Sequence, residues 1–272
     1  MTDPQNPYEA PSSDLLARPD AGHGSLLDVP RKLSAGRGLA WIGKAWGYFS
    51  QAPLNWILMI LILFALLFLL SLVPVLGPVA TILIMPALIA GFMLSCRDLD
   101  DGKGLMIERL FGAFSLPQRN RFFLLGGLYI VATIGVFLVV SLVTMLIMLA
   151  VVGISGMEAP LGDATAPQEI SGPAATVVGV SILIAMLLFI PVVMAFYFAP
   201  ALIAFHDLRV LDALVLSFKA VLRNILPLLV LAVVMLLLSI LAMIPFMLGF
   251  LVLGPVAIIT FYVGYREIFL EE

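Results

Sequence analysis

Charge is what this sequence lacks most. Of its 272 residues only 11% are charged, whereas 62% are hydrophobic and the mean hydropathy is +1.17. A soluble domain carries about a quarter charged residues, so water cannot be the main solvent for this chain. The net charge of -3 says little about partners, because the placement of so few charges matters more than their sum.

Cysteine is nearly absent as well. Cys96 is the only one, which excludes an intramolecular disulfide and any CxxC metal or redox motif. The first long apolar run begins at Leu54, after a polar segment, so we expect no cleavable signal peptide.

What the sequence has in abundance is long apolar stretches. They occupy residues 54–96, 122–153, 174–205 and 225–265, and Pro and Gly residues divide the first and last near 74–78 and 245–249. A spanning helix needs about 20 apolar residues, so the first and last stretches predict two spans each. The two middle stretches are longer and must tilt, kink at Pro191 and Pro200, or project beyond the bilayer. The predicted fold is an all-α polytopic membrane protein with six transmembrane helices, arranged as three hairpins.

Each predicted hairpin ends in a similar polar exit. Pro86 to Asp98 reads PALIAGFMLSCRD, Pro255 to Glu267 reads PVAIITFYVGYRE, and a looser version from Pro191 ends at His206-Asp207. An amphipathic stretch also precedes each hairpin, at residues 38–50, 106–114 and 208–223. We therefore expect three similar units, at about 38–98, 104–207 and 208–268, within a six-helix domain of residues 34–272.

Residues 1–33 are rich in Pro, Asp, Ser and Gly and have almost no apolar periodicity, so they predict a disordered cytoplasmic tail. Within the tail, the motif NPYEAP favours polyproline II and presents one aromatic ring. Its residues Asn6, Pro7, Tyr8 and Pro11 are a candidate contact for a cytoplasmic partner. The alternative is an ordinary low-complexity tail.

The basic residues are distributed on one side of the predicted topology. All 14 Lys and Arg residues lie in the tail, the amphipathic stretches, the segment 97–121 or at Arg266, and none lies in the turns or the 153–173 loop. By the positive-inside rule, both termini and all three amphipathic helices are expected to face the cytoplasm.

Chemistry-bearing constellations are scarce. No Asp, Glu, Lys or Arg falls inside a predicted span, which argues against ion-coupled transport. Gly153 to Gly156 matches the GxSG string of intramembrane serine proteases, but Ser155 and His206 are expected on opposite membrane faces. Cys96, His206 and Asp207 are expected at the same depth, near the cytoplasmic surface, but their positions in the sequence do not have the spacing of metal ligands. The sequence thus predicts no catalytic residue, cofactor or metal site.

The leading hypothesis is a non-enzymatic membrane protein that acts through contacts with lipid, with a second copy of itself or with another membrane protein, and not with nucleic acid. Four bases of the amphipathic stretches are candidate contacts for anionic lipid: Lys44, Arg109, Lys219 and Arg223. The alternative is a passive transporter or channel for a small uncharged or amphiphilic solute, with a cavity lined by carbonyls that span prolines leave free.

The exit pairs supply a second set of candidate residues: Arg97-Asp98, His206-Asp207 and Arg266-Glu267. Each base lies at a helix C-terminus, which favours a cation, whereas the adjacent acid needs another partner. We expect Asp98 and Asp207 to pair with bases of the amphipathic stretches, such as Arg109 and Arg209, or with an equivalent base from another unit.

Four segments carry a resemblance to known proteins: NPYEAP, GLAWIGKAW, FAPALIAFHD and LSFKAVLRNILP. They resemble a family of uncharacterised Gram-negative inner-membrane proteins, which is similar in turn to YciC-like proteins and to the membrane domain of some glycerophosphodiester phosphodiesterases. The resemblance implies six spans and an inner-membrane location. Because this sequence has no soluble catalytic domain, the phosphodiesterase activity does not carry over.

Overall fold

The structure is a computed structural model that describes residues 24–155 and 172–271. Helices make up most of this part of the chain, and its one extended pairing is an isolated bridge between Leu26 and Leu270. The elements in chain order are α1 (Arg37–Gln51), α2 (Pro53–Ser71), α3 (Leu76–Asp100), the 3-10 helix η2 (Ile107–Ser115), α4 (Arg119–Ser155), α5 (Gly172–Phe196), α6 (Ala199–His206), α7 (Val210–Arg223), α8 (Ile225–Met243) and α9 (Phe250–Phe269).

Within the described residues, six segments are long and apolar enough to cross a membrane, which confirms the predicted all-α polytopic class. They are Pro53–Ser71, Leu76–Asp100, Arg119–Ala150, Ala175–His206, Ile225–Met243 and Phe250–Phe269. The fourth consists of α5 and α6 together.

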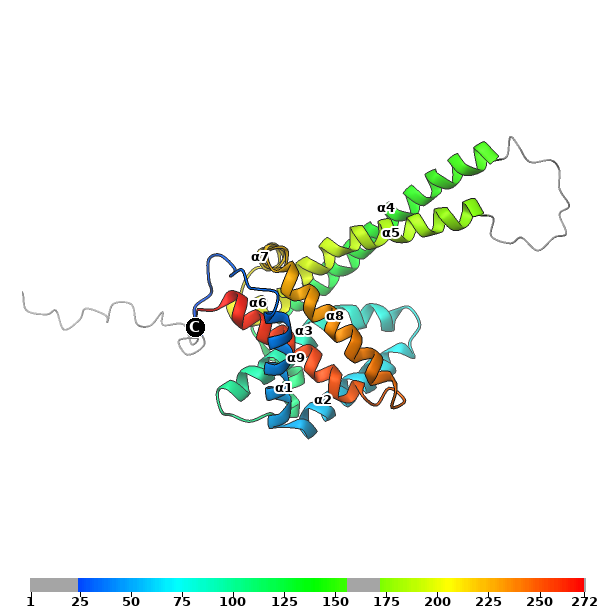
Figure 1. Cartoon of the computed structure of the whole chain (residues 1–272). Helices are drawn as coiled ribbons and strands as arrows, with labels where there is room; N and C mark the ends of the chain where they lie inside the picture. Colours follow the sequence, from blue (N-terminus) through cyan, green and yellow to red (C-terminus); the bar gives the residue numbers. More distant parts are fainter. Residues whose placement is uncertain (1–23, 156–171, 272) are drawn as a thin grey trace, which may run out of the picture.

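The helices α4 and α5 lie side by side and project as a pair from the remaining helices (Figure 1). Their large apolar side chains point outward along most of this projection, as at Val131, Phe137, Leu183 and Leu187. Water would disfavour such a surface, whereas hydrocarbon would not. The pair is therefore built for a lipid environment.

The other helices pack into a body whose interior is rich in aromatic residues. The largest fully buried side chains include Trp41 of α1, Trp56 of α2, Phe92 of α3 and Phe269 of α9. Trp56 and Phe92 stack with nearly parallel rings, 6.1 Å between centroids. The buried core thus joins the first and last helices of the chain near the ends of α3 and α9.

The long fourth span is interrupted next to Pro200, one of the two prolines at which a kink was expected, whereas α5 continues through Pro191. α5 ends at Phe196, and α6 begins at Ala199 with Pro200 in its first turn. Proline has no N–H to donate and clashes with the preceding turn, so the helix breaks instead of continuing. Pro86, Pro191 and Pro255, by contrast, lie inside continuous helices.

The predicted disordered tail requires a correction, because residues 24–33 are ordered. Leu27 N–H donates to the Phe269 carbonyl, and Arg31 N–H donates to the Ile268 carbonyl, both over 2.8 Å. Asn224 holds the other end of the segment: its side chain donates to the Arg31 carbonyl and accepts from Leu33 N–H. We call residues 24–33 the strap; it ties the start of the described chain to its end. Asn6, Pro7, Tyr8 and Pro11 lie outside the described residues.

Short helices precede the long ones at the three expected places. α1 and α7 are α-helical, whereas η2 is a 3-10 helix, and each has one buried and one exposed side. The order of one short helix followed by two long apolar segments therefore occurs three times. The internal repeat of units 38–98, 104–207 and 208–268 stays a prediction.

Candidate functional site

The C-terminal ends of α3, α6 and α9 carry the three predicted exit pairs, and each exit acid has an ion-pair partner on another segment. The partner of Asp98 is the one expected: Arg109 Nε lies 2.7 Å from Asp98 Oδ2, and Nη2 donates to Oδ1 over 3.1 Å. The Asp98 side chain is only 5% exposed. This pair therefore anchors η2 to α3, and Arg109 is occupied by a structural contact.

The expected partner of Asp207 was wrong. Asp207 pairs with Arg121 of α4, 2.7 Å between Nη1 and Oδ1, instead of with Arg209. Asp207 has a left-handed backbone conformation at the end of α6, and Arg121 also donates to the Asp207 and Leu208 carbonyls. Arg121 thus binds both the Asp207 carboxylate and the backbone just beyond α6, and so joins this end of α6 to α4.

Glu267, the exit acid of α9, is held by α1. It pairs with Arg37, accepts a 2.8 Å hydrogen bond from Trp41 Nε1, and lies 3.8 Å from Lys44 Nζ. The Glu267 side chain is 9% exposed. A carboxylate with this many donors is stable at such burial, so Glu267 links the first helix of the chain to the last.

Asp100 is the residue that sequence reasoning missed. Its carboxylate accepts hydrogen bonds from Tyr48 of α1 and Tyr262 of α9, and it pairs with Arg266 over 2.7 Å. Burial, with the Asp100 hydrogen bond next, raises the pKa of Tyr48 well above its usual range, so its hydroxyl stays protonated and able to donate. The sequence did offer one sign of its role, since Asp100 is a second acid only two residues after the Arg97-Asp98 pair.

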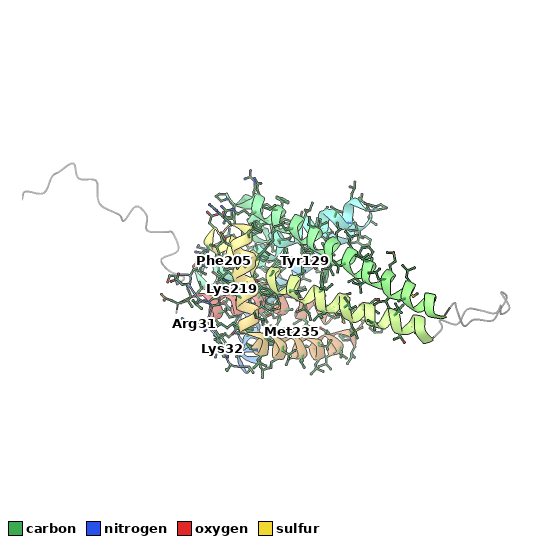
Figure 2. All side chains as sticks on the ribbon, turned by 90° about the horizontal axis from the view of Figure 1, so that it is seen from above. Arg31, Lys32, Tyr129, Phe205, Lys219 and Met235 are labelled. Atoms are coloured by element: carbon green, nitrogen blue, oxygen red, sulfur yellow. The ribbon has the colours of Figure 1, made fainter. Side chains whose placement is uncertain are left out.

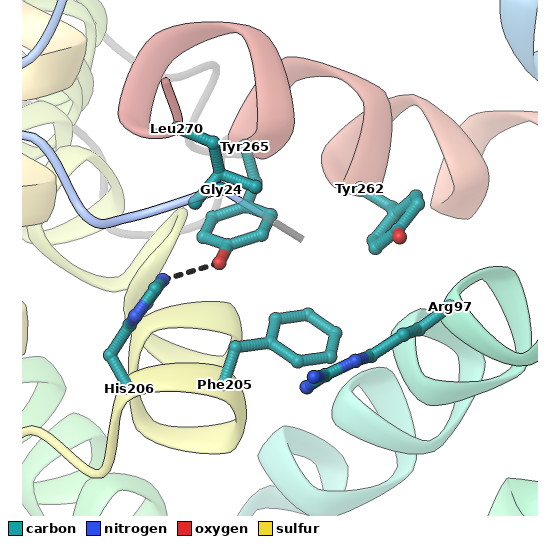
Figure 3. A pocket seen from close by; sticks show the side chains of 7 residues that line it. All are labelled: Gly24, Arg97, Phe205, His206, Tyr262, Tyr265 and Leu270. Carbon is teal, nitrogen blue, oxygen red and sulfur yellow. Dashed lines mark hydrogen bonds between the residues drawn. The ribbon is translucent and has the colours of Figure 1, made fainter. Parts of the chain in front are cut away.

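The exit residues of α3 and α6 meet α9 at a small cavity of about 20 Å³ (Figure 3). His206 Nε2 and the Tyr265 hydroxyl form a hydrogen bond across it. Arg97 lies over the Phe205 ring, 5.4 Å from its centroid, and thus makes a cation–π contact. The cavity has room for about one water molecule, too little for a substrate.

A larger recess of about 360 Å³ opens between α1 and α9. We call it the α1–α9 recess. Lys44, Gly47, Tyr48 and Gln51 line it from α1, and Val263, Arg266 and Glu267 line it from α9. It is the neighbour of both the Glu267 and the Asp100 networks, and it brings together two cations, Lys44 and Arg266.

An apolar recess of about 290 Å³ lies at the depth of the spans, between α3, α4 and α5–α6. Pro86 and Pro200 line it together with Ile82 and Phe196, the residues four positions before them, whose carbonyls lose a helical donor to these prolines. Thr81 and Tyr129 supply two hydroxyls. The recess lies beside two span prolines, and the cavity lined by free carbonyls stays a prediction.

The remaining candidate bases form an exposed patch on the surface. Lys219 and Arg223 are exposed one turn apart on α7, and neither forms an ion pair with a described residue. Asn224 binds the strap beside them, and Figure 2 shows Arg31 and Lys32 of the strap near Lys219, at the end of the molecule away from the tips of α4 and α5. We call Arg31, Lys32, Lys219 and Arg223 the basic patch.

Ser217 of α7 satisfies the backbone where the fourth span breaks. Its buried hydroxyl accepts from Phe198 N–H and donates to the Met194 carbonyl, both over 2.9 Å. Ser217→Ala should lower stability by about 2 kcal/mol, because it leaves two buried backbone groups without partners. Thermal unfolding in detergent measures this.

The control for that prediction is Ser239→Ala in α8. Ser239 only donates back to the Met235 carbonyl of its own helix, so this variant should melt like the wild type. Equal melting temperatures for both variants would contradict the role given to Ser217.

A metal site finds no support in the described residues, which contain no cluster of three or more His, Cys, Asp or Glu side chains able to hold an ion. Cys96 is buried in α3.

Comparison with known proteins gives one informative relative. Over 196 residues the chain is 33% identical to a probable inner membrane protein of Burkholderia thailandensis, and the match covers 71% of this chain and 70% of that protein. No family model and no solved structure matches the chain.

Proposed function

We propose that this chain, which belongs to the same family as the probable inner membrane protein of Burkholderia thailandensis, acts by contact with anionic phospholipid at the cytoplasmic surface of the membrane and not by catalysis. In the same proposal, both termini are cytoplasmic, and the likeness to YciC-like proteins and to the phosphodiesterase membrane domain reflects a shared membrane architecture.

The basic patch carries this proposal. Its two α7 bases have no acidic partner among the described residues, whereas Arg109 is paired with Asp98 and Lys44 lies near Glu267. Unpaired bases beside membrane-spanning helices attract an anionic leaflet by about 1 kcal/mol each. Lys219 and Arg223 are thus the members of the predicted lipid-contact set that support it best.

The test replaces Lys219 and Arg223 with Gln in the full chain. The association constant for phosphatidylglycerol, measured in nanodiscs against phosphatidylcholine, should fall by about 10–30-fold, since two bases contribute about 2 kcal/mol. The weakening should disappear at high salt, where exposed charges are screened.

The matched control is Lys103→Gln. Lys103 is also exposed, but it already pairs with Asp101 over 2.7 Å, so its removal should change lipid association little. Unchanged phosphatidylglycerol binding in the Lys219→Gln/Arg223→Gln variant would refute the proposal.

The apolar recess favours a second candidate, a passive carrier of a small uncharged or amphiphilic solute. It combines free volume at the depth of the spans with two hydroxyls and two prolines, Pro86 and Pro200. Solute flux in proteoliposomes separates the two candidates: flux that Tyr129→Phe or Thr81→Val alters would favour the carrier.

A further inference from the structure

The α1–α9 recess differs from the basic patch in being concave and built on both sides. One wall is the amphipathic α1 and the other is the last turns of the spanning helix α9. Its position at the end of a span puts it at headgroup depth if α9 crosses the bilayer. Its volume of about 360 Å³ falls in the range of small-molecule sites.

The two cations of the recess have donors to spare. Arg266 uses Nη1 for Asp100 and Tyr48, and no described residue accepts a hydrogen bond from its Nη2 or Nε. The Lys44 side chain is 49% exposed and lies 3.8 Å from Glu267, beyond hydrogen-bond distance. Both side chains can therefore donate to a ligand without breaking an existing hydrogen bond.

The local charge balance favours an anion. The residues that line the recess include two cations, Lys44 and Arg266, and one carboxylate, Glu267. Glu267 is already satisfied by Arg37 and Trp41. A phosphate group has several acceptor oxygens and can therefore accept hydrogen bonds from the Lys44 ammonium and the Arg266 guanidinium together.

Gly47 is an open position on the α1 wall of the recess. It lines the recess, and a Cβ added to it would meet nothing within 4 Å. A side chain added there starts in open space and can extend into the recess. Gly43, one turn earlier on α1, has the same open surroundings but does not line the recess.

We propose that the α1–α9 recess binds the phosphate group of one phospholipid, with Lys44 and Arg266 donating to its oxygens. This site rests on the proposed membrane-surface role but is separate from the basic patch. The patch attracts anionic lipid non-specifically, whereas the recess holds a single headgroup.

The experiment is native mass spectrometry of the full chain, delipidated in detergent and titrated with phosphatidylglycerol. One lipid should bind tightly to the wild type. Gly47→Leu and Lys44→Gln should each weaken this first binding at least tenfold, and Lys44→Arg should restore it. Gly43→Leu should bind like the wild type, and equal melting temperatures for the two Leu variants show that the fold is unchanged.

Undiminished first binding of phosphatidylglycerol in Gly47→Leu or in Lys44→Gln would overturn the inference. So would binding of inorganic phosphate or glycerol phosphate as tight as that of the lipid, because it would assign a soluble ligand to the recess. The Lys219→Gln/Arg223→Gln variant separates this proposal from the preceding one. It should lose the later, weak binding events and keep the first.

Discussion

Gly38→Ala is expected to lower the melting temperature by about 6–12 °C. α1 packs against α8 at this point, and a Cβ on Gly38 would lie 2.1 Å from the Pro227 carbonyl oxygen and 3.0 Å from the Leu231 nitrogen. Both are backbone atoms and cannot rotate away. The helices must separate, at a cost of about 3 kcal/mol.

The control lies on the same helix. Gly43→Ala places its methyl group in open space, and alanine is the better helix former by about 1 kcal/mol. This variant should therefore melt at or above the wild-type temperature. If both variants melt alike in detergent, the close approach of α1 and α8 is not a determinant of stability.

Arg109→Met should destabilise the protein by about 3 kcal/mol. The substitution leaves the Asp98 carboxylate, whose side chain is 5% exposed, without the cation that compensates its burial. Because the pair joins η2 to α3, protease cleavage within 101–118 should also become faster. Thermal unfolding and limited proteolysis measure the two effects.

Two variants test whether the cause is the unpaired charge. Asp98→Asn/Arg109→Met removes both charges and should recover most of the lost stability, as neutral replacements of buried pairs usually do. Lys103→Met breaks the exposed pair with Asp101 and should cost at most about 1 kcal/mol. A double variant no more stable than Arg109→Met would indicate lost packing instead.

Apolar length predicted the class of fold because spans obey a simple rule. A run such as 225–265 has to cross the hydrocarbon twice, and its Pro and Gly residues at 245–249 mark where it turns. The structure has α8 and α9 on either side of that turn. Pro200 also predicted the break in the fourth span, since a missing N–H acts locally.

Contacts between distant segments were harder to predict. The strap is held mainly by backbone hydrogen bonds to residues 268–271, and such bonds leave no pattern in side-chain types. Asp100 joins Tyr48, Tyr262 and Arg266 from helices far apart in the chain. Arg109 was predicted as the partner of Asp98 because the amphipathic stretches were the nearest source of bases at the same depth. The same argument gave Arg209 for Asp207, which pairs with Arg121 instead.

The four predicted lipid-contact bases lie in different environments in the structure, and the sequence could not show this either. Amphipathic spacing shows that Lys44, Arg109, Lys219 and Arg223 lie on polar faces, but not which polar face packs against an acid. Arg109 meets Asp98, whereas Lys219 and Arg223 remain exposed. Only the assembled helices distinguish a structural cation from one that can face a lipid.

The orientation of the spans is the most direct test of the account, because both proposals need the strap and α7 to face the anionic inner leaflet. Cys96 is buried, so maleimide labelling reports only the one cysteine that is introduced. Ser34→Cys lies between the strap and α1, and Phe246→Cys lies in the 244–249 turn, where Phe246 is 94% exposed. In intact spheroplasts, a membrane-impermeant maleimide should label Phe246→Cys at once and Ser34→Cys only after permeabilisation. The reverse order, or equal labelling of both, would contradict the account.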